Sequence, residues 1–285
     1  MAISIRQLSQ TFGAEIADVD LSQPIGDETF NKILDAFHTY SVLVFRDQKI
    51  SSEQHIAFSR RFGDLEIHML KSSLLPRYDE ILVVSNVVEE GGPRGAYSAG
   101  QFWHSDLSYK ECPSLGSLLH AIEVPAEGIG NTEFADMTAA YNGLSEEMKQ
   151  RIDGLKSVHR YRSIGARKVG LLVDDPNLKH SMDQVRVPDM AHPIVRTHPA
   201  TGRKALYVNE GLCVAIPDMP EDESTALLKE LFVHSTRPEF KYSHKWRAND
   251  LVMWDNRCTI HRATPIESSV RRVMHRTTIR GDKPS

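Results

Sequence analysis

The chain has 285 residues, of which 40% are hydrophobic and 25% are charged, and its formal net charge is −4. This composition is typical of a soluble globular protein, and 34 basic residues in an acidic chain argue against a nucleic-acid-binding surface. All-β proteins of this length commonly bury one large core. We therefore expect a single domain spanning residues 1–285.

Cysteine usage and hydropathy indicate an intracellular protein. Cys112, Cys213 and Cys258 are widely spaced and form no Cys-x-x-Cys motif, so neither a disulfide framework nor a thiolate metal site is indicated. The N-terminus lacks the apolar run of a signal peptide, and no stretch approaches the ~18 apolar residues of a membrane span. We expect a cytoplasmic protein with no nucleic-acid and no membrane partner.

The first third of the chain predicts two helices around a buried strand. Asp27 is a candidate N-cap, and apolar residues follow it at helical spacing, namely Phe30, Ile33, Leu34 and Phe37. Residues 41–45 are a short apolar run typical of a buried strand. Ser51 and Gln54 then form a possible capping box for a second helix that should stop at Gly63.

Two segments lack clear periodicity and are candidate loops over a binding site. Residues 89–100 contain four glycines, a composition that fits a mobile lid and a plain surface loop equally well. Residues 160–189 are polar and irregular, which inside a compact domain is typical of a covering loop or a mobile insert.

The remaining elements alternate between helical and strand patterns. Asp136 and Ser145 are candidate caps in a helical region at 135–155. The other expected elements are strands at 117–124 and 251–255, a hairpin from 193–198 and 204–209, a helix at 221–234, an alternating segment at 240–246 and a last strand at 271–279.

A histidine and an aspartate one residue apart, His104 and Asp106, are the first sign of a metal site. On an extended strand, residues i and i+2 project to the same face, so both side chains can reach one point. With His261 as a third ligand they would form the facial triad that holds Fe(II) and leaves the opposite face open. On its own, a His-x-Asp pair is also typical of a strand histidine hydrogen-bonded to a nearby aspartate.

Two arginines follow the distal histidine. Arg272 comes 11 residues after His261, and Arg276 comes four residues later, so on one strand the two arginines share a face. The planar guanidinium suits bidentate binding of carboxylates. Surface salt bridges are the ordinary alternative, but two arginines on one face beside a metal ligand favour a binding role.

Together with a glycine-containing turn at 128–130 that leads into Thr132, this pattern resembles the taurine dioxygenase and 2,4-dichlorophenoxyacetate dioxygenase family of Fe(II)- and 2-oxoglutarate-dependent oxygenases. The likeness spans nearly the whole chain, and residues 254–258 suggest the aryloxyalkanoate branch. It implies a mainly β fold with flanking α-helices, a double-stranded β-helix or jelly roll, which period-two strands alone allow without specifying. It also implies a dimer or tetramer.

The resemblance assigns roles at the iron site and at the co-substrate site. Fe(II) would be held by His104, Asp106 and His261, with 2-oxoglutarate and O2 as co-substrates. Arg272 would bind the distal carboxylate of 2-oxoglutarate, and the Thr132 hydroxyl would contact the same molecule, although residues 129–131 depart from the usual Gly-Gly-Asp. Trp254 would form a wall of this site or belong to the core.

The substrate residues are less uniquely assigned. Arg276 would bind an anionic group, and Gln101, three residues before the first ligand, is a further candidate contact. Taurine-type enzymes carry a substrate-binding histidine where His68 stands, whereas the phenoxyacetate type carries a lysine where Lys71 stands. This chain has both residues.

The implied reaction consumes O2 and 2-oxoglutarate, releases succinate and CO2, and hydroxylates a small anionic organic substrate. An aryloxyalkanoate whose ether bond is cleaved is the favoured substrate. The alternative is a taurine, alkylsulfonate or sulfate-ester dioxygenase, which His68 would favour. A more remote alternative is a non-catalytic metal- or acid-binding jelly roll, which would have no use for Thr132 and Arg272.

Overall fold

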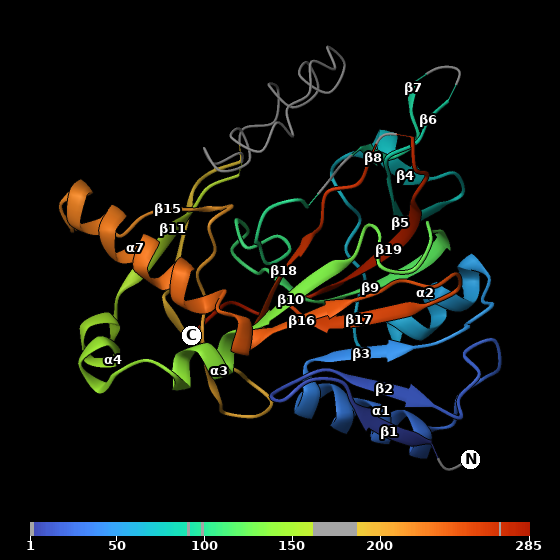
Figure 1. The fold of residues 1–285 in the computed structure, drawn as a ribbon, viewed down its shortest axis with the longest axis horizontal. Helices are drawn as coiled ribbons and strands as arrows, with labels where there is room; N and C mark the ends of the chain where they lie inside the picture. Colours follow the sequence, from blue (N-terminus) through green and yellow to red (C-terminus); the bar gives the residue numbers. More distant parts are fainter. Residues whose placement is uncertain (1–2, 90–91, 98–99, 162–186, 268) are drawn as a thin grey trace.

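The computed structural model of the chain describes all residues except 1–2, 90–91, 98–99, 162–186 and 268. Its centre is a nine-stranded sheet in the order β1, β2, β3, β17, β9, β19, β5, β4, with β8 beside β5 (Figure 1). These strands are β1 (Ser4–Gln7), β2 (Ala14–Ala17), β3 (Val42–Phe45), β17 (Leu251–Asp255), β9 (Ser114–Glu123), β19 (Val273–Arg280), β5 (Tyr78–Ser85), β4 (Leu74–Leu75) and β8 (Ala96–Tyr97).

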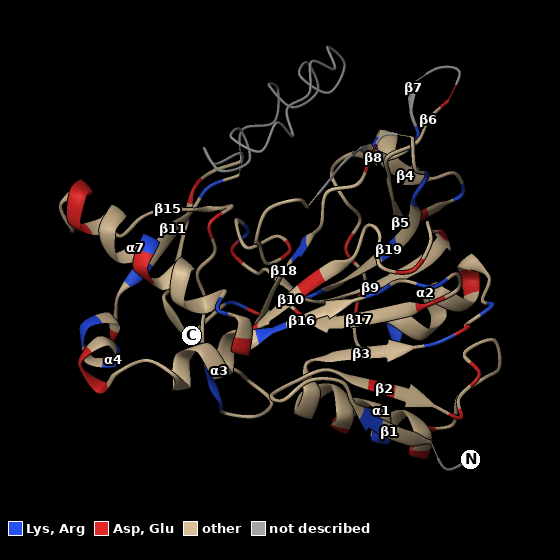
Figure 2. Cartoon of the chain, viewed as in Figure 1, with Lys and Arg blue, Asp and Glu red and all other residues tan. Residues whose placement is uncertain are grey.

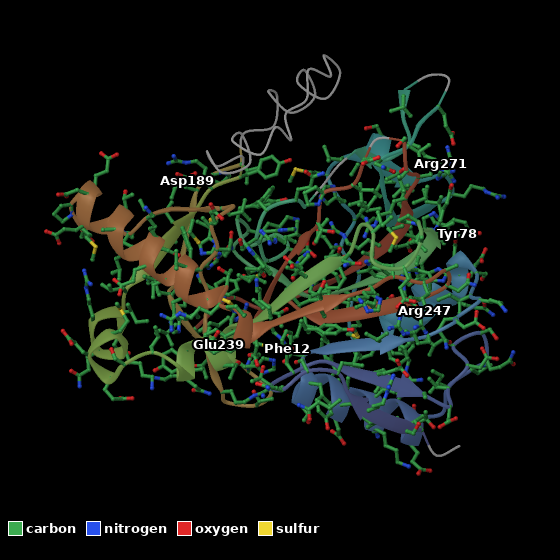
Figure 3. The ribbon with its side chains drawn as sticks, viewed as in Figure 1. Phe12, Tyr78, Asp189, Glu239, Arg247 and Arg271 are labelled. Atoms are coloured by element: carbon green, nitrogen blue, oxygen red, sulfur yellow. The ribbon has the colours of Figure 1, made fainter. Side chains whose placement is uncertain are left out.

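A smaller sheet packs against this one. It has the order β16, β10, β18, formed by Lys241–His244, Thr132–Asp136 and Thr259–Ala263. Phe134 of β10 shares one buried cluster with large-sheet residues such as Val252 and Met274, so the two sheets form a sandwich. Side chains fill the space between the sheets (Figure 3), where Phe12 is 1% exposed.

The strand pattern explains how the large sheet separates two cores. In β17, Leu251 and Met253 face a cluster under the helices, whereas Val252 and Trp254 face the smaller sheet. Residues two apart on a strand share a face, and every residue of β17 is buried, which explains the continuous apolar run in the sequence.

Two helices cover the outer face of the large sheet, as expected. Helix α1 (Asp27–Tyr40) is capped by the backbone of Gly26, so the predicted side-chain cap at Asp27 is wrong. Asp27 instead lies in the first turn, where its negative charge interacts favourably with the positive end of the helix dipole. In α2 (Ser52–Arg60) the capping box is confirmed, but the helix ends three residues before the predicted stop at Gly63.

Three further helices gather at the other end of the molecule (Figure 1), namely α3 (Met137–Asn142), α4 (Glu146–Ile152) and α7 (Glu221–Ser235). The predicted caps are confirmed, because Asp136 accepts hydrogen bonds from the first turn of α3 and Ser145 does so in α4. The predicted helical region starts too early, since Asp136 ends strand β10. The predicted helix at 221–234 is present as α7, whose Leu227, Leu228 and Leu231 are buried.

The remaining strands form small sheets. The expected hairpin is present as β13 (Val195–Thr197) and β14 (Lys204–Leu206). The others are β11 (Lys156–His159), β12 (Met190–Pro193), β15 (Cys213–Ala215), β6 (Val88–Glu89) and β7 (Gly92–Pro93), and the short helices are η1 (Lys71–Ser73) and η2 (Pro238–Phe240). Part of the expected 89–100 loop is thus a hairpin, whereas most of the expected 160–189 loop lies outside the described residues.

Charged side chains of both signs are interspersed over the same elements (Figure 2), and many form pairs such as Arg46 with Asp250 and Arg160 with Asp189. Within the ranges that the structure describes, no helix combines the length and the apolar character needed to cross a membrane.

Candidate metal centre and co-substrate site

The two candidate histidine ligands face each other across a backbone pairing. The His104 N–H donates to the His261 carbonyl at 3.0 Å, and the His261 N–H donates to the His104 carbonyl at 2.9 Å. Their ring centroids are 4.2 Å apart. Two residues 157 positions apart in sequence are therefore brought together by strand β18.

The third ligand arrives by a turn, not by the extended strand that the sequence predicted. His104 forms an isolated bridge, Asp106 lies in the turn that follows, and Leu107 adopts a φ of +58°. The two carboxylate oxygens of Asp106 lie 3.8 Å from Nε2 of His104 and of His261, respectively. Two ligand atoms on one ion are about 3 to 4 Å apart for bond lengths near 2.1 Å, so the donor set fits a metal.

The two imidazoles are held in different ways. His104 donates from Nδ1 to the Phe102 carbonyl at 2.8 Å, which leaves Nε2 with its lone pair toward Asp106. The His261 ring instead packs on Trp254, with centroids 4.6 Å apart, and on Phe134. Burial lowers the pKa of both histidines, so they remain neutral and able to coordinate a metal.

Asp106 is anchored by two donors. Ser117 Oγ donates to Oδ2 at 2.7 Å, and Arg276 Nη1 donates to Oδ1 at 2.7 Å. Burial raises the pKa of Asp106, but the positive charge of Arg276, with a further contribution from the Ser117 hydrogen bond, outweighs burial and holds the pKa well below its usual range. The carboxylate is therefore ionised, as a metal ligand must be.

Asn256 connects these parts, and the sequence reasoning did not identify it. Its Oδ1 accepts from the Asp106 backbone N–H at 3.1 Å and from the Trp254 indole at 3.0 Å. Its Nδ2 donates to Ser114 Oγ at 3.0 Å and to Ser117 Oγ at 3.2 Å. One fully buried amide thus holds the Asp106 backbone and the serine that binds the Asp106 carboxylate.

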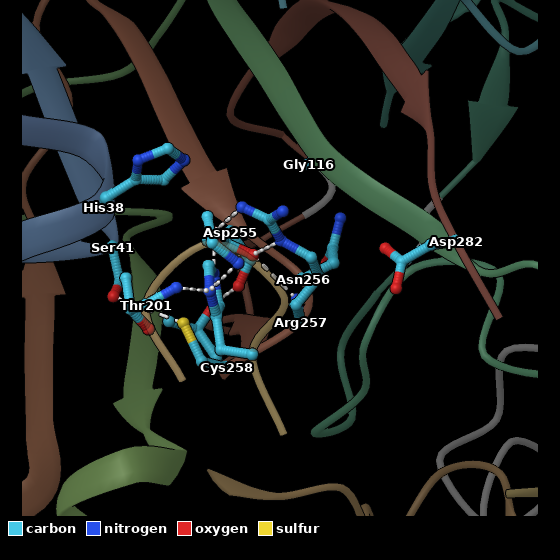
Figure 4. Close-up of polar contacts among 12 residues, drawn as sticks. His38, Ser41, Gly116, Thr201, Asp255, Asn256, Arg257, Cys258 and Asp282 are labelled. Atoms are coloured by element: carbon cyan, nitrogen blue, oxygen red, sulfur yellow. Dashed lines mark hydrogen bonds and ion pairs between the residues drawn. The ribbon is translucent and has the colours of Figure 1, made fainter. Parts of the chain in front are cut away.

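The turn that carries Asn256 is fixed by an ion pair (Figure 4). Arg257 donates to both oxygens of Asp255 at 2.8 and 2.6 Å, and His198 lies 3.0 Å from Oδ2. His198, Asp255 and Cys258 are a second group close enough to hold a metal. Because the Asp255 oxygens are already occupied by these donors, we interpret this group as structural.

Arg272 has the properties expected for a carboxylate site. Its side chain is 8% exposed, its Nε is buried without a partner, and no described carboxylate forms an ion pair with it. Burial lowers its pKa to about 10, so the guanidinium remains charged at neutral pH. A buried, uncompensated charge is costly, which fits a site completed by an anionic ligand. The residue precedes β19, so the predicted placement of both arginines on one strand is wrong.

The other expected co-substrate residues lie close to this arginine or to the triad. Gly130 packs against Arg272, since a Cβ at Gly130 would lie 3.4 Å from the arginine Cδ. Thr132 begins β10, is buried, and accepts a hydrogen bond from Trp246. Trp254 is 1% exposed, belongs to the core between the sheets and contacts His261.

The predicted substrate residues separate into two groups. Arg276 contacts Asp106, and its Nε is buried without a partner. Burial and the charge of Arg276 lower the pKa of His68 to about 4, and the Leu70 N–H donates to His68 Nδ1 at 3.2 Å, which leaves Nε2–H as a donor. Lys71 is exposed in η1. Gln101 lines a small pocket together with Arg272.

An apolar cluster beside the metal loop was also missed in the sequence. It comprises Leu107, Tyr109 and Leu212, with Met69 and Tyr161 packed against it. The Tyr109 and Tyr161 rings have centroids 4.6 Å apart. Burial raises the pKa of Tyr109 far above its usual range, so its phenol is neutral, and the charges of Arg276 and Asp106 also act on it. Because Leu107 directly follows Asp106 in the chain, the cluster lies beside the candidate metal ligands.

Comparisons with known proteins agree with this geometry. The model of the "Taurine catabolism dioxygenase TauD, TfdA family" matches residues 4–278. An alpha-ketoglutarate-dependent 2,4-dichlorophenoxyacetate dioxygenase of Cupriavidus pinatubonensis is 36% identical over 292 residues and covers 99% of both chains. An (S)-phenoxypropionate/alpha-ketoglutarate-dioxygenase of Sphingobium herbicidovorans is 34% identical and covers 100% of this chain and 97% of its own.

A solved structure is equally similar. The crystal structure of AAD-2 in complex with Mn(II) and N-oxalylglycine is 35% identical, covers 100% of this chain and 99% of its own, and superposes with a TM-score of 0.82. The predicted jelly-roll fold is thereby confirmed, with sheets that remain open at their edges. The chain belongs to the TauD/TfdA family of dioxygenases.

Proposed function

We propose that this protein is an Fe(II)- and 2-oxoglutarate-dependent dioxygenase that hydroxylates a small carboxylate with an apolar or aromatic body, in the manner of an aryloxyalkanoate. One observation carries the proposal: Arg276, whose Nε has no partner, contacts the ligand Asp106 beside the apolar cluster around Tyr109. Anion recognition, the metal ligands and an apolar wall thus converge in one place.

The residues fit the iron and its co-substrate. When bound, Fe(II) together with 2-oxoglutarate and O2 supplies the oxidising power for attack on a C–H bond, with release of succinate and CO2. His104, Asp106 and His261 would hold the metal, and a set of three protein ligands leaves coordination positions for the co-substrate and O2. Arg272, whose Nε has no hydrogen-bond partner, would bind a carboxylate of 2-oxoglutarate, to which the Thr132 hydroxyl can also donate.

Substrate recognition needs an anion site and a surface for the rest of the molecule. Arg276 and the Nε2–H of His68 supply donors for an anionic group. Tyr109 and its neighbours offer a buried apolar face to the body of the substrate. Such a site holds the target carbon next to the triad while it excludes water from the reaction.

Hydroxylation explains how an ether bond is broken. When the attacked carbon carries an ether oxygen, its new hydroxyl group makes the product a hemiacetal. The hemiacetal collapses to a carbonyl compound and an alcohol or phenol, with the hydroxyl proton passing to the leaving oxygen. For an aryloxyacetate the products are glyoxylate and a phenol.

A sulfonate or sulfate-ester substrate is the second candidate. The observation in its favour is that the positive charge of Arg276 contributes to the lowered pKa of His68. The Lys71 side chain, in contrast, is exposed to solvent. The apolar cluster opposes it, because a short alkylsulfonate has no apolar body to pack against Tyr109 and its neighbours. A non-catalytic binding protein fits less well, since the buried Arg272 then has no assigned partner.

The test is substrate-dependent succinate formation by anaerobically purified, Fe(II)-loaded enzyme. The panel comprises aryloxyacetates, both enantiomers of 2-aryloxypropionates, taurine, other alkylsulfonates and alkyl sulfates. We expect the aryloxy acids to stimulate succinate formation. Stimulation by sulfonates or sulfates alone would contradict the proposed substrate class, and absence of 2-oxoglutarate turnover under all conditions would contradict the enzyme class.

Location and assembly are separate proposals. We infer a cytoplasmic location, which the unpaired state of Cys112, Cys213 and Cys258 supports. We also infer a homodimer or homotetramer, which light scattering coupled to size-exclusion chromatography will test.

A further inference from the structure

Trp246 contacts both residues that we assign to 2-oxoglutarate. It follows strand β16 and is 1% exposed. Its indole N–H donates to Thr132 Oγ1 at 3.0 Å, and the Arg272 guanidinium carbon lies 5.8 Å from its ring centre. A single rigid side chain therefore lies against two donors of one carboxylate site.

The polarity of the hydrogen bond decides what Thr132 can do. An indole N–H is only a donor, so the Thr132 oxygen accepts from Trp246. A threonine hydroxyl has one proton, and no described residue accepts it. The proton is thus left to donate to a ligand, which must be an acceptor such as a carboxylate oxygen.

Trp246 is itself held in place. Its ring meets the His244 ring edge to face, with centroids 4.6 Å apart and an angle of 84°. His244 lies between the Tyr242 hydroxyl at 3.1 Å and the Asp250 carboxylate at 3.2 Å, and Asp250 also pairs with Arg46. This buried polar chain restricts the orientation of the indole.

We propose that Trp246 is a positioning residue, which turns the Thr132 hydroxyl into a donor and supports the Arg272 guanidinium, so that together they bind one carboxylate of 2-oxoglutarate. This inference rests on the function proposed above. It adds a residue that acts through Thr132 and Arg272 and sets the donor pattern of the site.

Affinity for an unreactive analogue tests the inference without turnover. Mn(II)-loaded protein is titrated with N-oxalylglycine in a calorimeter, comparing wild type with Trp246→Phe, which keeps an aromatic ring and removes the N–H. We expect the dissociation constant to rise about tenfold, the size of one lost hydrogen bond, with Mn(II) affinity unchanged. Unchanged affinity for N-oxalylglycine would overturn the inference.

A double-mutant cycle separates positioning from packing. If Trp246 acts through the hydroxyl, Trp246→Phe has little further effect in a Thr132→Val background, whereas it keeps its full effect in a Thr132→Ser background. Equal loss of affinity in all three backgrounds would assign Trp246 a packing role only. Failure of the wild type to bind N-oxalylglycine would instead contradict the proposed function.

One measurement leaves Trp246 intact, in case Trp246→Phe does not fold. In protein loaded with diamagnetic Zn(II), the indole N–H resonance of Trp246 should shift upfield in Thr132→Val relative to wild type and Thr132→Ser. An indole resonance that is the same in all three proteins would show that the hydrogen bond is absent and would overturn the inference.

Discussion

Arg276 donates a hydrogen bond of 2.7 Å to the carboxylate of Asp106. The residue that we assign to the substrate anion therefore also touches a metal ligand. Binding of an anion at Arg276 would change the charge balance around Asp106, because the Arg276 and Asp106 side chains are only 13% and 5% exposed and solvent screens them little. If Arg276 binds the substrate anion as proposed, its guanidinium group couples substrate binding to the metal ligand Asp106.

Substitution of Arg272 and of Arg276 should affect the KM values of different compounds. We expect Arg272→Ala to raise the KM for 2-oxoglutarate at least tenfold, because it removes the charged partner of a carboxylate. Arg276→Ala should raise the substrate KM more than the KM for 2-oxoglutarate. Steady-state kinetics with each compound varied in turn will measure both effects, and equal losses for both compounds in both variants would mean that the roles are misassigned.

Asn256 should control metal affinity without being a ligand. Asn256→Ala removes the acceptor of the Asp106 N–H and leaves Ser117 free to rotate. We expect Fe(II) affinity to fall about 10- to 100-fold, as for other residues that orient metal ligands, and the free energy of unfolding to fall by about 1–3 kcal/mol.

Metal titration and urea unfolding measure the two effects of Asn256→Ala separately. Asp106→Ala removes the ligand itself and serves as the reference variant, for which we expect no Fe(II) binding and no turnover. Wild-type metal affinity in Asn256→Ala would contradict the orienting role, and full activity in Asp106→Ala would contradict the ligand assignment.

Tyr109 should act through its ring and not through its hydroxyl. We expect Tyr109→Phe to retain the substrate KM, because no described residue accepts a hydrogen bond from the phenol. Tyr109→Ala should raise the KM for aryloxy acids about tenfold, the loss expected for about 1.4 kcal/mol of apolar contact. Comparing Tyr109→Phe with Tyr109→Ala separates the role of the ring from that of the hydroxyl. Equal substrate KM values in the two variants would contradict the proposal that the cluster packs against the substrate.

Acid should destabilise the fold through buried histidines. Burial, with smaller contributions from neighbouring histidines, lowers the pKa of His55 and of His159 to about 3, against an ordinary value of 6.5. Below pH 6.5 these two histidines are protonated in the unfolded chain but stay neutral in the folded chain. The free energy of unfolding therefore falls as the pH falls from 6.5 toward 3. At pH 5 each histidine costs about 2 kcal/mol.

Urea unfolding at pH 7.5 and pH 5 measures this acid effect. His159→Gln replaces the imidazole with a neutral amide next to Ser108 and Ser157, so the difference between the two pH values should shrink. A wild-type urea midpoint that is the same at both pH values would contradict this account, as would an unchanged difference in the variant.

The candidate metal ligands could be predicted from the sequence, whereas the residues that we propose position them could not. His104, Asp106 and His261 are indicated by residue type, spacing and the family resemblance, and a short, mostly apolar run predicts the buried strand at 251–255. Asn256 gives no periodic signal, since its role depends on contacts with residues more than 130 positions away.

The other omissions have the same physical origin. Nothing in the sequence singles out Trp246 or Tyr109, because their contacts with Thr132 and Tyr161 exist only in the folded chain. The turn at Asp106 was missed because φ of +58° at Leu107 is unusual for a leucine and has no sequence signature.

The most direct test of the proposed function is the stoichiometry of ether cleavage. Fe(II)-loaded enzyme is supplied with 2-oxoglutarate, O2 and phenoxyacetate, and phenol and succinate are quantified together. The account predicts one phenol for each succinate formed in excess of the rate without substrate. Succinate without phenol, or stimulation by taurine while phenoxyacetate has no effect, would contradict it.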